Sequence, residues 1–426
     1  MDAIIQRKRV SHSLDLFLVF GFLFYSNATA FFNLLWLAPQ IIQGESVLWV
    51  LWAMFTIWIL KKHNLLSEFI NNLRKNWIVF PFLVFSGLSI FWSVDWGISL
   101  CRWIIFICTI IAGGYIGLQY GMEKIIEFLS VFGIFILFIS AIFVFFMPNI
   151  GVMNYYIIQG AWKGLYWHKN HMGLIASFLS LLFLLNIIIS WQPNKKHIWF
   201  WGLFYLFSLL FVYESGSVAA YMITIILHGV ILLALIWLRF RSMIRKSHYL
   251  ILIVILFFAS LILILNLNHL FEIFNRNTSL TGRIPMWVDL FNTYISKRPF
   301  GGYGFNAFWY LPSHRVAMGI AAGYPDPIVI SDNGFIDILV NTGFIGLILF
   351  LIFYLSLWWH SLKYAWKSKD IIGFFPVILM FFTLLANISW SLIFENEGFF
   401  MLLMVSVLFY ISTKSLPSKK TDTTLS

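Results

Sequence analysis

The sequence predicts an all-α protein of about 12 transmembrane helices with one large extracytoplasmic loop. Of its 426 residues 61% are hydrophobic and only 11% are charged, whereas about 25% are charged in a soluble domain. The apolar residues gather in runs near the roughly 20 residues that span a bilayer as a helix. The 20% aromatic content also suits a protein that lines two membrane interfaces with Trp and Tyr. A water-soluble globular protein is therefore excluded.

Twelve apolar segments follow one another along the chain. They cover residues 16–36, 46–60, 77–92, 97–118, 125–147, 172–190, 198–213, 217–238, 249–267, 335–359, 371–393 and 398–412. The second and seventh are short, which flanking side chains and local thinning of the bilayer accommodate. The first follows three basic residues as a signal peptide does, but its apolar run continues to Trp36. This length favours an uncleaved anchor.

The charge distribution predicts the orientation of these helices. Lys and Arg exceed Asp and Glu by 28 to 17, a net charge of +11. If the N-terminus is cytoplasmic, 20 of the 28 basic residues lie on the cytoplasmic side, as the positive-inside rule requires. We therefore expect both termini in the cytoplasm and no nucleic-acid partner.

The segments divide the chain into four parts. We expect a membrane bundle of about nine helices in residues 1–267, an extracytoplasmic loop in 268–334, about three helices in 335–412, and a polar cytoplasmic tail in 413–426. Cys101 and Cys108 are seven residues apart on one predicted helix, too far for a disulfide. We interpret them as packing residues.

The large loop contains the sharpest local feature, an arginine at a predicted helix start. Apolar residues recur with helical spacing after Arg283, at positions 284, 287, 288, 291, 294 and 295, and Pro285 falls in the first turn, where proline is tolerated. Free backbone amides, the helix dipole and a guanidinium form a site for phosphate or diphosphate. The alternative is a helix that lies in the interface with Arg283 among lipid headgroups.

Further polar residues lie at the same outer level. Arg102 is about five residues inside its apolar segment, so it either binds a ligand together with Arg283 or snorkels outward. Asp332 precedes a predicted helix, where it is either the N-cap or a general base. His314 is a second candidate base, or simply a solvated loop residue. The Gly301–Gly304 run indicates a tight turn or a close backbone approach to a ligand, and it lacks the Lys-Ser/Thr of a nucleotide loop.

A polar cluster begins the sixth segment. It contains His168, Lys169, Asn170 and His171. Two histidines three residues apart can bind a metal on a helix, but no third ligand is evident. We therefore predict neither a metal nor a cofactor.

Five patches give the chain a resemblance to the O-antigen ligase and polymerase family, which includes exopolysaccharide polymerases. In order they are residues 99–102 with 114–117, residues 164–173, residues 215–217, residues 281–283 with 298–304, and residues 332–339 with 343–346. Each patch is weak alone, but together they run from the fourth predicted helix to the tenth. Their order and their placement carry the resemblance.

The resemblance implies an inverting, metal-independent glycosyltransferase of the bacterial inner membrane, with a glycan on undecaprenyl diphosphate as donor. The family's arginine positions match Arg283 and Arg102, and its His-Lys-Asn patch matches His168 to Asn170. Asp332 and Asn333 stand where ligases of this family usually have His and Asn. This departure favours Asp332 as the base and a polymerase that joins repeat units.

The predicted mechanism uses few residues. Asp332 accepts the proton of an acceptor hydroxyl, and Arg283 stabilises the leaving diphosphate with help from Arg102, Arg276 or Arg315. The alternative within this class is a ligase that transfers polymer onto lipid A core. A flippase for lipid-linked oligosaccharides is the alternative outside it. Expected partners are the donor, an acceptor glycan or lipid A core, the bilayer and a chain-length regulator.

Overall fold

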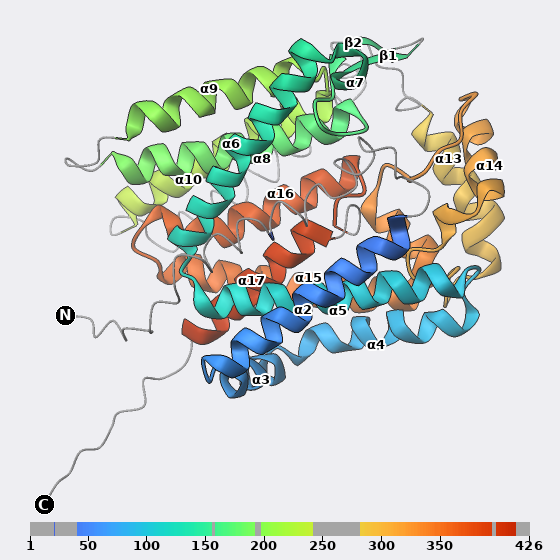
Figure 1. The fold of residues 1–426 in the computed structure, drawn as a ribbon, viewed down its shortest axis with the longest axis horizontal. Coiled ribbons are helices and arrows are strands. Elements are labelled where there is room, and N and C mark those ends of the chain that lie inside the picture. The colour runs from blue at the N-terminus through green and yellow to red at the C-terminus, as the bar shows by residue number, and fades with distance from the viewer. Residues whose placement is uncertain are drawn as a thin grey trace, which may run out of the picture.

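A computed structural model describes residues 41–155, 158–191, 197–241, 282–393 and 398–414, together with residue 21. Its long helices run side by side along the longest dimension of the molecule (Figure 1). Six of the described helices are long and apolar enough to cross a membrane, or seven if a bent pair counts as one span. The all-α class is thereby confirmed. The predicted segments 16–36 and 249–267, residues 268–281 with Arg276, and the tail after 414 lie outside the described residues.

The ten predicted segments within the described residues coincide with helical residues, while the total of twelve spans stays a prediction. The six long helices are α5 (Trp96–Gln119), α6 (Met122–Phe146), α8 (Lys169–Ser190), α10 (Val218–Phe240), α15 (Gly334–Lys367) and η6 with α16 (Ile371–Phe374, Phe375–Ser389). The bent pair is α3 (Leu66–Lys75) with η1, α4 and η2 (Trp77–Val79, Phe80–Leu88, Ser89–Trp92), bent by 66°. The other helices of the bundle are α2 (Ile41–Lys62), α7 (Pro148–Gly151), α9 (Ile198–Glu214) and α17 (Phe399–Lys414).

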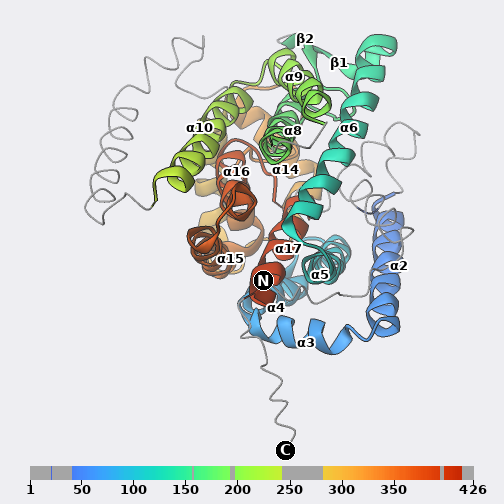
Figure 2. The ribbon, with the colours of Figure 1, turned by 90° about the vertical axis from the view of Figure 1, so that its left-hand side faces the viewer.

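The helices α8 and α17 are the most enclosed in the bundle, as the end-on view shows (Figure 2). Glycines on α5 allow α17 to approach closely. A Cβ atom on Gly113 would lie 2.6 Å from the carbonyl oxygen of Leu402, and one on Gly117 would lie 2.1 Å from that of Ser406. Small residues at this spacing are a common packing device in membranes. The glycines at 113–117 therefore serve helix packing.

A two-stranded hairpin covers the N-terminal end of α8. Strand β1 (Val152–Tyr155) pairs antiparallel with β2 (Ile158–Trp162), and a bulge follows Met153. The amide of Lys169 donates to the sulfur of Met153 at 3.2 Å. This hairpin was not predicted, because strands of four and five residues are too short to show a clear alternation of apolar and polar residues.

Helix α15 is broken at Gly343, where φ is +68° and ψ is −174°. The loop before it supplies the hydrogen bonds that the break removes. The amides of Tyr303 and Gly304 donate to the carbonyls of Val340 and Asn341 at 3.1 and 2.9 Å, and the amide of Phe344 donates to Pro299 at 2.7 Å. The first nine residues of α15 thus form a separate half-helix with satisfied ends.

The glycine run at 301–304 closely approaches this half-helix and the segment around Ser93. A Cβ atom on Gly302 would lie 2.5 Å from the backbone of Asn341, and one on Gly304 would lie 2.1 Å from the hydroxyl of Ser93. Both glycines also have positive φ. The run is therefore a tight turn that packs against the protein itself, and a contact with a ligand stays a prediction.

The same end of the bundle carries the rest of the large loop. It contains α13 (Arg283–Asp289), a π-helical turn (Leu290–Tyr294), η4 (Ile295–Lys297), η5 (Phe308–Tyr310) and α14 (Pro312–Ala322). Their small core contains Met286, Leu290, Phe308, Trp309 and Met318. In Figure 1, α13, α14 and the hairpin lie at the right-hand end of the bundle.

Candidate functional site

The candidate site is built around Arg283, the first residue of α13. Gly282 before it has φ of +82°, and a Cβ atom there would lie 2.2 Å from the carbonyl of Ala322. Glycine is therefore required where the chain turns into α13 against α14. The predicted helix starts at Arg283 as expected, so a guanidinium does stand at a helix N-terminus.

The buried face of α13 differs from the predicted one. Met286 and Leu290 are 1% and 0% exposed, whereas Ile284, Val288 and Phe291 are 41%, 53% and 50% exposed. Both faces of this short helix are apolar, so periodicity could not decide which one meets the core. An exposed apolar ridge, defined as Ile284, Val288 and Phe291, therefore runs along α13 and the π-helical turn after it, beside Arg283.

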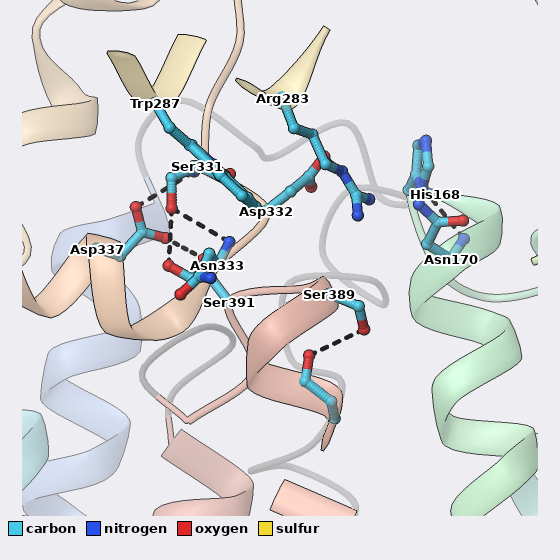
Figure 3. Close-up of polar contacts among 11 residues, drawn as sticks. His168, Asn170, Arg283, Trp287, Ser331, Asp332, Asn333, Asp337, Ser389 and Ser391 are labelled. Carbon is cyan, nitrogen blue, oxygen red and sulfur yellow. Dashed lines mark hydrogen bonds and ion pairs between the residues drawn. The ribbon is translucent and has the colours of Figure 1, made fainter. Parts of the chain in front are cut away.

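Arg283 and Asp332 form an ion pair at the centre of the site (Figure 3). The Nε–H of Arg283 donates to Oδ2 of Asp332 at 2.9 Å, and the two side chains are 20% and 25% exposed. The terminal nitrogens of Arg283 point away from this carboxylate and, within the described chain, donate to no protein acceptor. They can therefore receive an anion while Nε holds Asp332.

Asp332 lies in a strained turn before α15, with φ of +57°. The N-cap of α15 is Asn333, whose side chain accepts from the amides of Phe335 and Ile336 at 3.0 and 3.2 Å. The N-cap interpretation of Asp332 is therefore wrong. Burial raises the pKa of Asp332, while the charge and the hydrogen bond of Arg283 oppose the rise.

The turn is tied directly to α13. The indole N–H of Trp287 donates to the carbonyl of Ser331 at 2.7 Å, and Trp287 lies one turn after Arg283 on the same helix. This bond therefore fixes the distance between the helix that carries Arg283 and the turn that carries Asp332.

His168 is the N-cap of α8 and approaches from the other side of the site (Figure 3). Its Nδ1 accepts from the amide of Asn170 at 3.1 Å, which assigns the proton of the neutral ring to Nε2. Burial, together with smaller contributions from the charges of Lys169, Arg283 and Lys163, lowers the pKa of His168 to about 3. The ring is thus a neutral donor in a region where three cationic side chains converge.

Lys169 connects two of the sequence patches. It is 8% exposed, and its amine donates to the carbonyl of Gly216 at 2.8 Å. On the next turn of α8, a Cβ atom on Gly173 would lie 2.6 Å from the hydroxyl of Ser215. The Ser215–Ser217 patch is therefore packed against α8, and the Lys169 charge is held close behind His168.

Arg102 and Arg315 meet at another residue, Tyr310. Arg102 donates to the Tyr310 hydroxyl, and the two guanidinium carbons lie 5.5 and 5.7 Å from the centre of its ring. Arg102 also lines a small open cavity together with Thr109, Phe305 and Asn306. Among the described residues no contact joins Arg102 to Arg283, so a shared diphosphate clamp stays a prediction.

His314 lies within the aromatic core of the loop. Its ring stacks on Phe308 with centroids 4.2 Å apart, and it contacts the rings of Tyr294 and Tyr303. Its Nδ1 is 3.0 Å from the carbonyl of Phe308, and burial lowers its pKa. The structure thus surrounds His314 with packing contacts, none of which involves Arg283 or Asp332.

Sequence reasoning missed three residues that support the site. Asp337, on the first turn of α15, accepts from the indole of Trp309 at 2.8 Å, from the amide of Ser331 at 3.2 Å and from the hydroxyl of Ser391. Trp390 stacks on His168. A carboxylate inside an apolar segment could have drawn attention to Asp337, but Trp390 and Ser391 carry no such signal.

Fold and site together define an α-helical membrane protein with a cationic site at one end of its bundle. Residues 201–351 match the family model described as O-antigen ligase, which confirms the family resemblance predicted from the motifs. The matched region contains Arg283, Asp332 and Asp337 and excludes Arg102 and His168. No curated protein matches the chain.

Proposed function

We propose that this protein is an inverting glycosyltransferase of the bacterial inner membrane. Its donor is a glycan on undecaprenyl diphosphate, its acceptor is a second lipid-linked glycan, and the product is a polymer of O-antigen or exopolysaccharide repeat units. The O-antigen ligase family match supports the class of reaction. The observation that carries the proposal is the Arg283–Asp332 pair, in which one nitrogen holds a carboxylate and two point away from it.

The charges around the site suit a diphosphate. Lys163, Lys169 and Arg283 all lower the pKa of His168, so their fields add at one place. The Nε2–H of the neutral His168 and the terminal nitrogens of Arg283 are hydrogen-bond donors for the oxygens of an anion. Such donors stabilise the negative charge that grows on a leaving diphosphate.

The apolar ridge on α13 suits the lipid part of this donor. Ile284, Val288 and Phe291 are exposed directly beside the anion site. A molecule with a charged head and a long hydrocarbon chain matches this combination, because the chain covers apolar surface that would otherwise face water.

In the proposed reaction, Asp332 accepts the proton of the acceptor hydroxyl as its oxygen bonds to the anomeric carbon. The bond from that carbon to the phosphate oxygen breaks, and its electron pair leaves with the diphosphate against Arg283. Attack opposite the leaving group inverts the configuration, through a transition state with oxocarbenium character like that of glycosidases. The guanidinium of Arg283 contacts Asp332 through Nε, and its terminal nitrogens point to the other side. The proposed proton acceptor and the proposed site of the leaving diphosphate are therefore adjacent.

The described basic residues support an outward-facing site. The end of the bundle opposite the site carries eleven of them: Lys61, Lys62, Arg74, Lys75, Lys124, Arg239, Arg241, Lys363, Lys367, Lys369 and Lys414. The positive-inside rule places that end in the cytoplasm. The site then faces the extracytoplasmic side, where a lipid-linked glycan is presented.

The test is transfer by the purified full-length protein in lipid nanodiscs. The probe is an oligosaccharide repeat unit on undecaprenyl diphosphate, and we expect longer lipid-linked glycans together with free undecaprenyl diphosphate. The Asp332→Asn variant, which keeps the size of the side chain, should lose most of this transfer. Translocation of the probe without transfer would contradict the proposal and favour a flippase.

The family description favours one second candidate, a ligase that transfers finished polymer onto lipid A core. A deletion strain separates the two. Loss of a polymerase leaves single repeat units on the cell surface, whereas loss of a ligase leaves long polymer on the lipid carrier.

A further inference from the structure

The candidate site consists of two halves that come from distant parts of the chain. One half is α13 with the turn 331–333, which carries Arg283 and Asp332, and the other is the start of α8 with His168. Among the described residues, no hydrogen bond joins the side chains of one half to those of the other. A third segment, the turn after α16 with Trp390 and Ser391, contacts both.

We propose that Asp337, Ser391 and Trp390 form a bridge that positions the two halves against each other. This inference rests on the proposed function, since the relative position of His168 and Asp332 matters only if one substrate contacts both. The three residues are positioning residues, and none of them is proposed to contact the substrate.

The first part of the bridge is the carboxylate of Asp337. Its Oδ2 accepts from the hydroxyl of Ser391, and its Oδ1 accepts from the amide of Ser331 at 3.2 Å. Ser331 immediately precedes Asp332, and its own hydroxyl donates to the carbonyl of Asn333 at 2.7 Å. Asp337 therefore connects the turn after α16 to the strained backbone of Asp332 through two hydrogen bonds.

The second part is the ring of Trp390, the residue before Ser391. It is 2% exposed and stacks on the imidazole of His168 with centroids 5.1 Å apart and planes at 22°. It also packs against Trp167 at 5.3 Å. Trp390 thus contacts the half with His168, and Ser391 contacts the half with Asp332 through Asp337. Because these two residues are adjacent in the chain, a single peptide bond connects the two contacts.

The bridge is itself held in place by α16. The side-chain oxygen of Asn387 accepts from the amides of Leu392 and Ile393 at 2.9 and 3.2 Å. A Cβ atom on Gly334 would lie 2.2 Å from that same oxygen, so the start of α15 packs directly against the turn. Because the turn is held rigidly, it can keep His168 and Asp332 at a fixed distance from each other.

The experiment removes the Ser391 hydroxyl. Ser391→Ala should lower kcat for transfer from the lipid-linked donor by roughly ten- to hundredfold, because misplacement of catalytic groups by about 1 Å has such effects. KM for the donor should change by no more than about twofold, since the cationic groups remain. Ser391→Thr keeps the hydroxyl and should restore most of kcat.

Ser389→Ala is the matched control. Among the described residues its hydroxyl bonds only to the carbonyls of Leu385 and Ala386 in its own helix, two residues from Ser391. Equal effects of the two alanine variants would overturn the proposal, as would a fall in activity that merely follows the amount of folded protein.

Hydrogen–deuterium exchange separates this inference from the proposed function. Ser391→Ala should increase deuterium uptake in peptides covering residues 328–336 and 166–172, while Ser389→Ala should leave both at the wild-type level. This readout requires no transfer activity. If the wild-type protein transfers no glycan, the proposed function fails, whereas unchanged exchange at both peptides overturns the bridge.

Discussion

Replacement of Arg283 by lysine is the sharpest test of the anion site. In the structure Nε of Arg283 is bonded to Asp332 at 2.9 Å, and the terminal nitrogens point away from it. A lysine keeps the charge but has a single ammonium group, which cannot hold the carboxylate and a bidentate diphosphate in the same geometry. The variant therefore loses either the position of Asp332 or the support of the leaving group.

The expected loss is large in catalysis and small in stability. Removal of one transition-state donor typically lowers kcat by about 10²–10³-fold, equivalent to about 2.7–4 kcal/mol. The ion pair is partly exposed, so its contribution to folding is at most about 1 kcal/mol, and the packing of Met286 and Leu290 is untouched. We expect Arg283→Lys to fold normally and to transfer glycan at about 1% of the wild-type rate or less.

The assay is initial-rate transfer in nanodiscs at saturating donor, with size-exclusion profiles as the measure of folding. Arg298→Lys is the control, because Arg298 is exposed and donates to the carbonyl of Trp92 at 3.2 Å, away from Asp332. Activity of Arg283→Lys near that of the control would refute the reasoning, since charge alone would then suffice.

Three further changes test the fold and the electrostatics. Gly343→Ala should lower the temperature midpoint of unfolding, because φ of +68° costs an L residue about 1–3 kcal/mol and the new Cβ would lie 2.3 Å from the backbone of Phe300. Gly229→Ala is the control and should leave the midpoint unchanged, because a Cβ atom there meets open space beside α10. Gly117→Ala should separate α5 from α17 and lower the yield of folded protein, and unchanged yield would contradict close packing. The pKa of His168 is lowered to about 3 in the folded state. Between about pH 6.5 and pH 3 this imidazole is therefore protonated in the unfolded state but not in the folded state. The free energy of unfolding should accordingly decrease as the pH falls through this range. His168→Asn, which keeps an N-cap acceptor, should reduce that decrease between pH 7 and pH 5, and an identical slope would argue against a buried neutral ring.

The helices were predictable because the bilayer imposes a length and an apolar composition that the sequence displays directly. The start of α13 at Arg283 was also predictable, because Gly282 and Pro285 mark a helix start in the local sequence. Which face of α13 is buried was not, because both faces are apolar and only contacts from α14 and η5 decide.

The site was only partly accessible from the sequence. Arg283 and Asp332 were recognised as separate residues of one loop, but their contact depends on the turn at 331–333 and on the indole of Trp287. The N-cap interpretation of Asp332 failed because Asn333, one residue later, competes for the same role with a better-placed side chain. Trp390 and His168 stack although they are more than 200 positions apart in the sequence, and no local sequence pattern predicts such a contact.

The break in α15 has a consequence for the order in which the chain can fold. The carbonyls of Val340 and Asn341 and the amide of Phe344 are satisfied by residues 299–304, which are synthesised earlier. An unsatisfied backbone group costs several kcal/mol in a membrane, so the break is stable only where this loop has already arrived. Translocation of the loop would then precede insertion of the apolar part of α15, and the turn that carries Asp332 would acquire its geometry last.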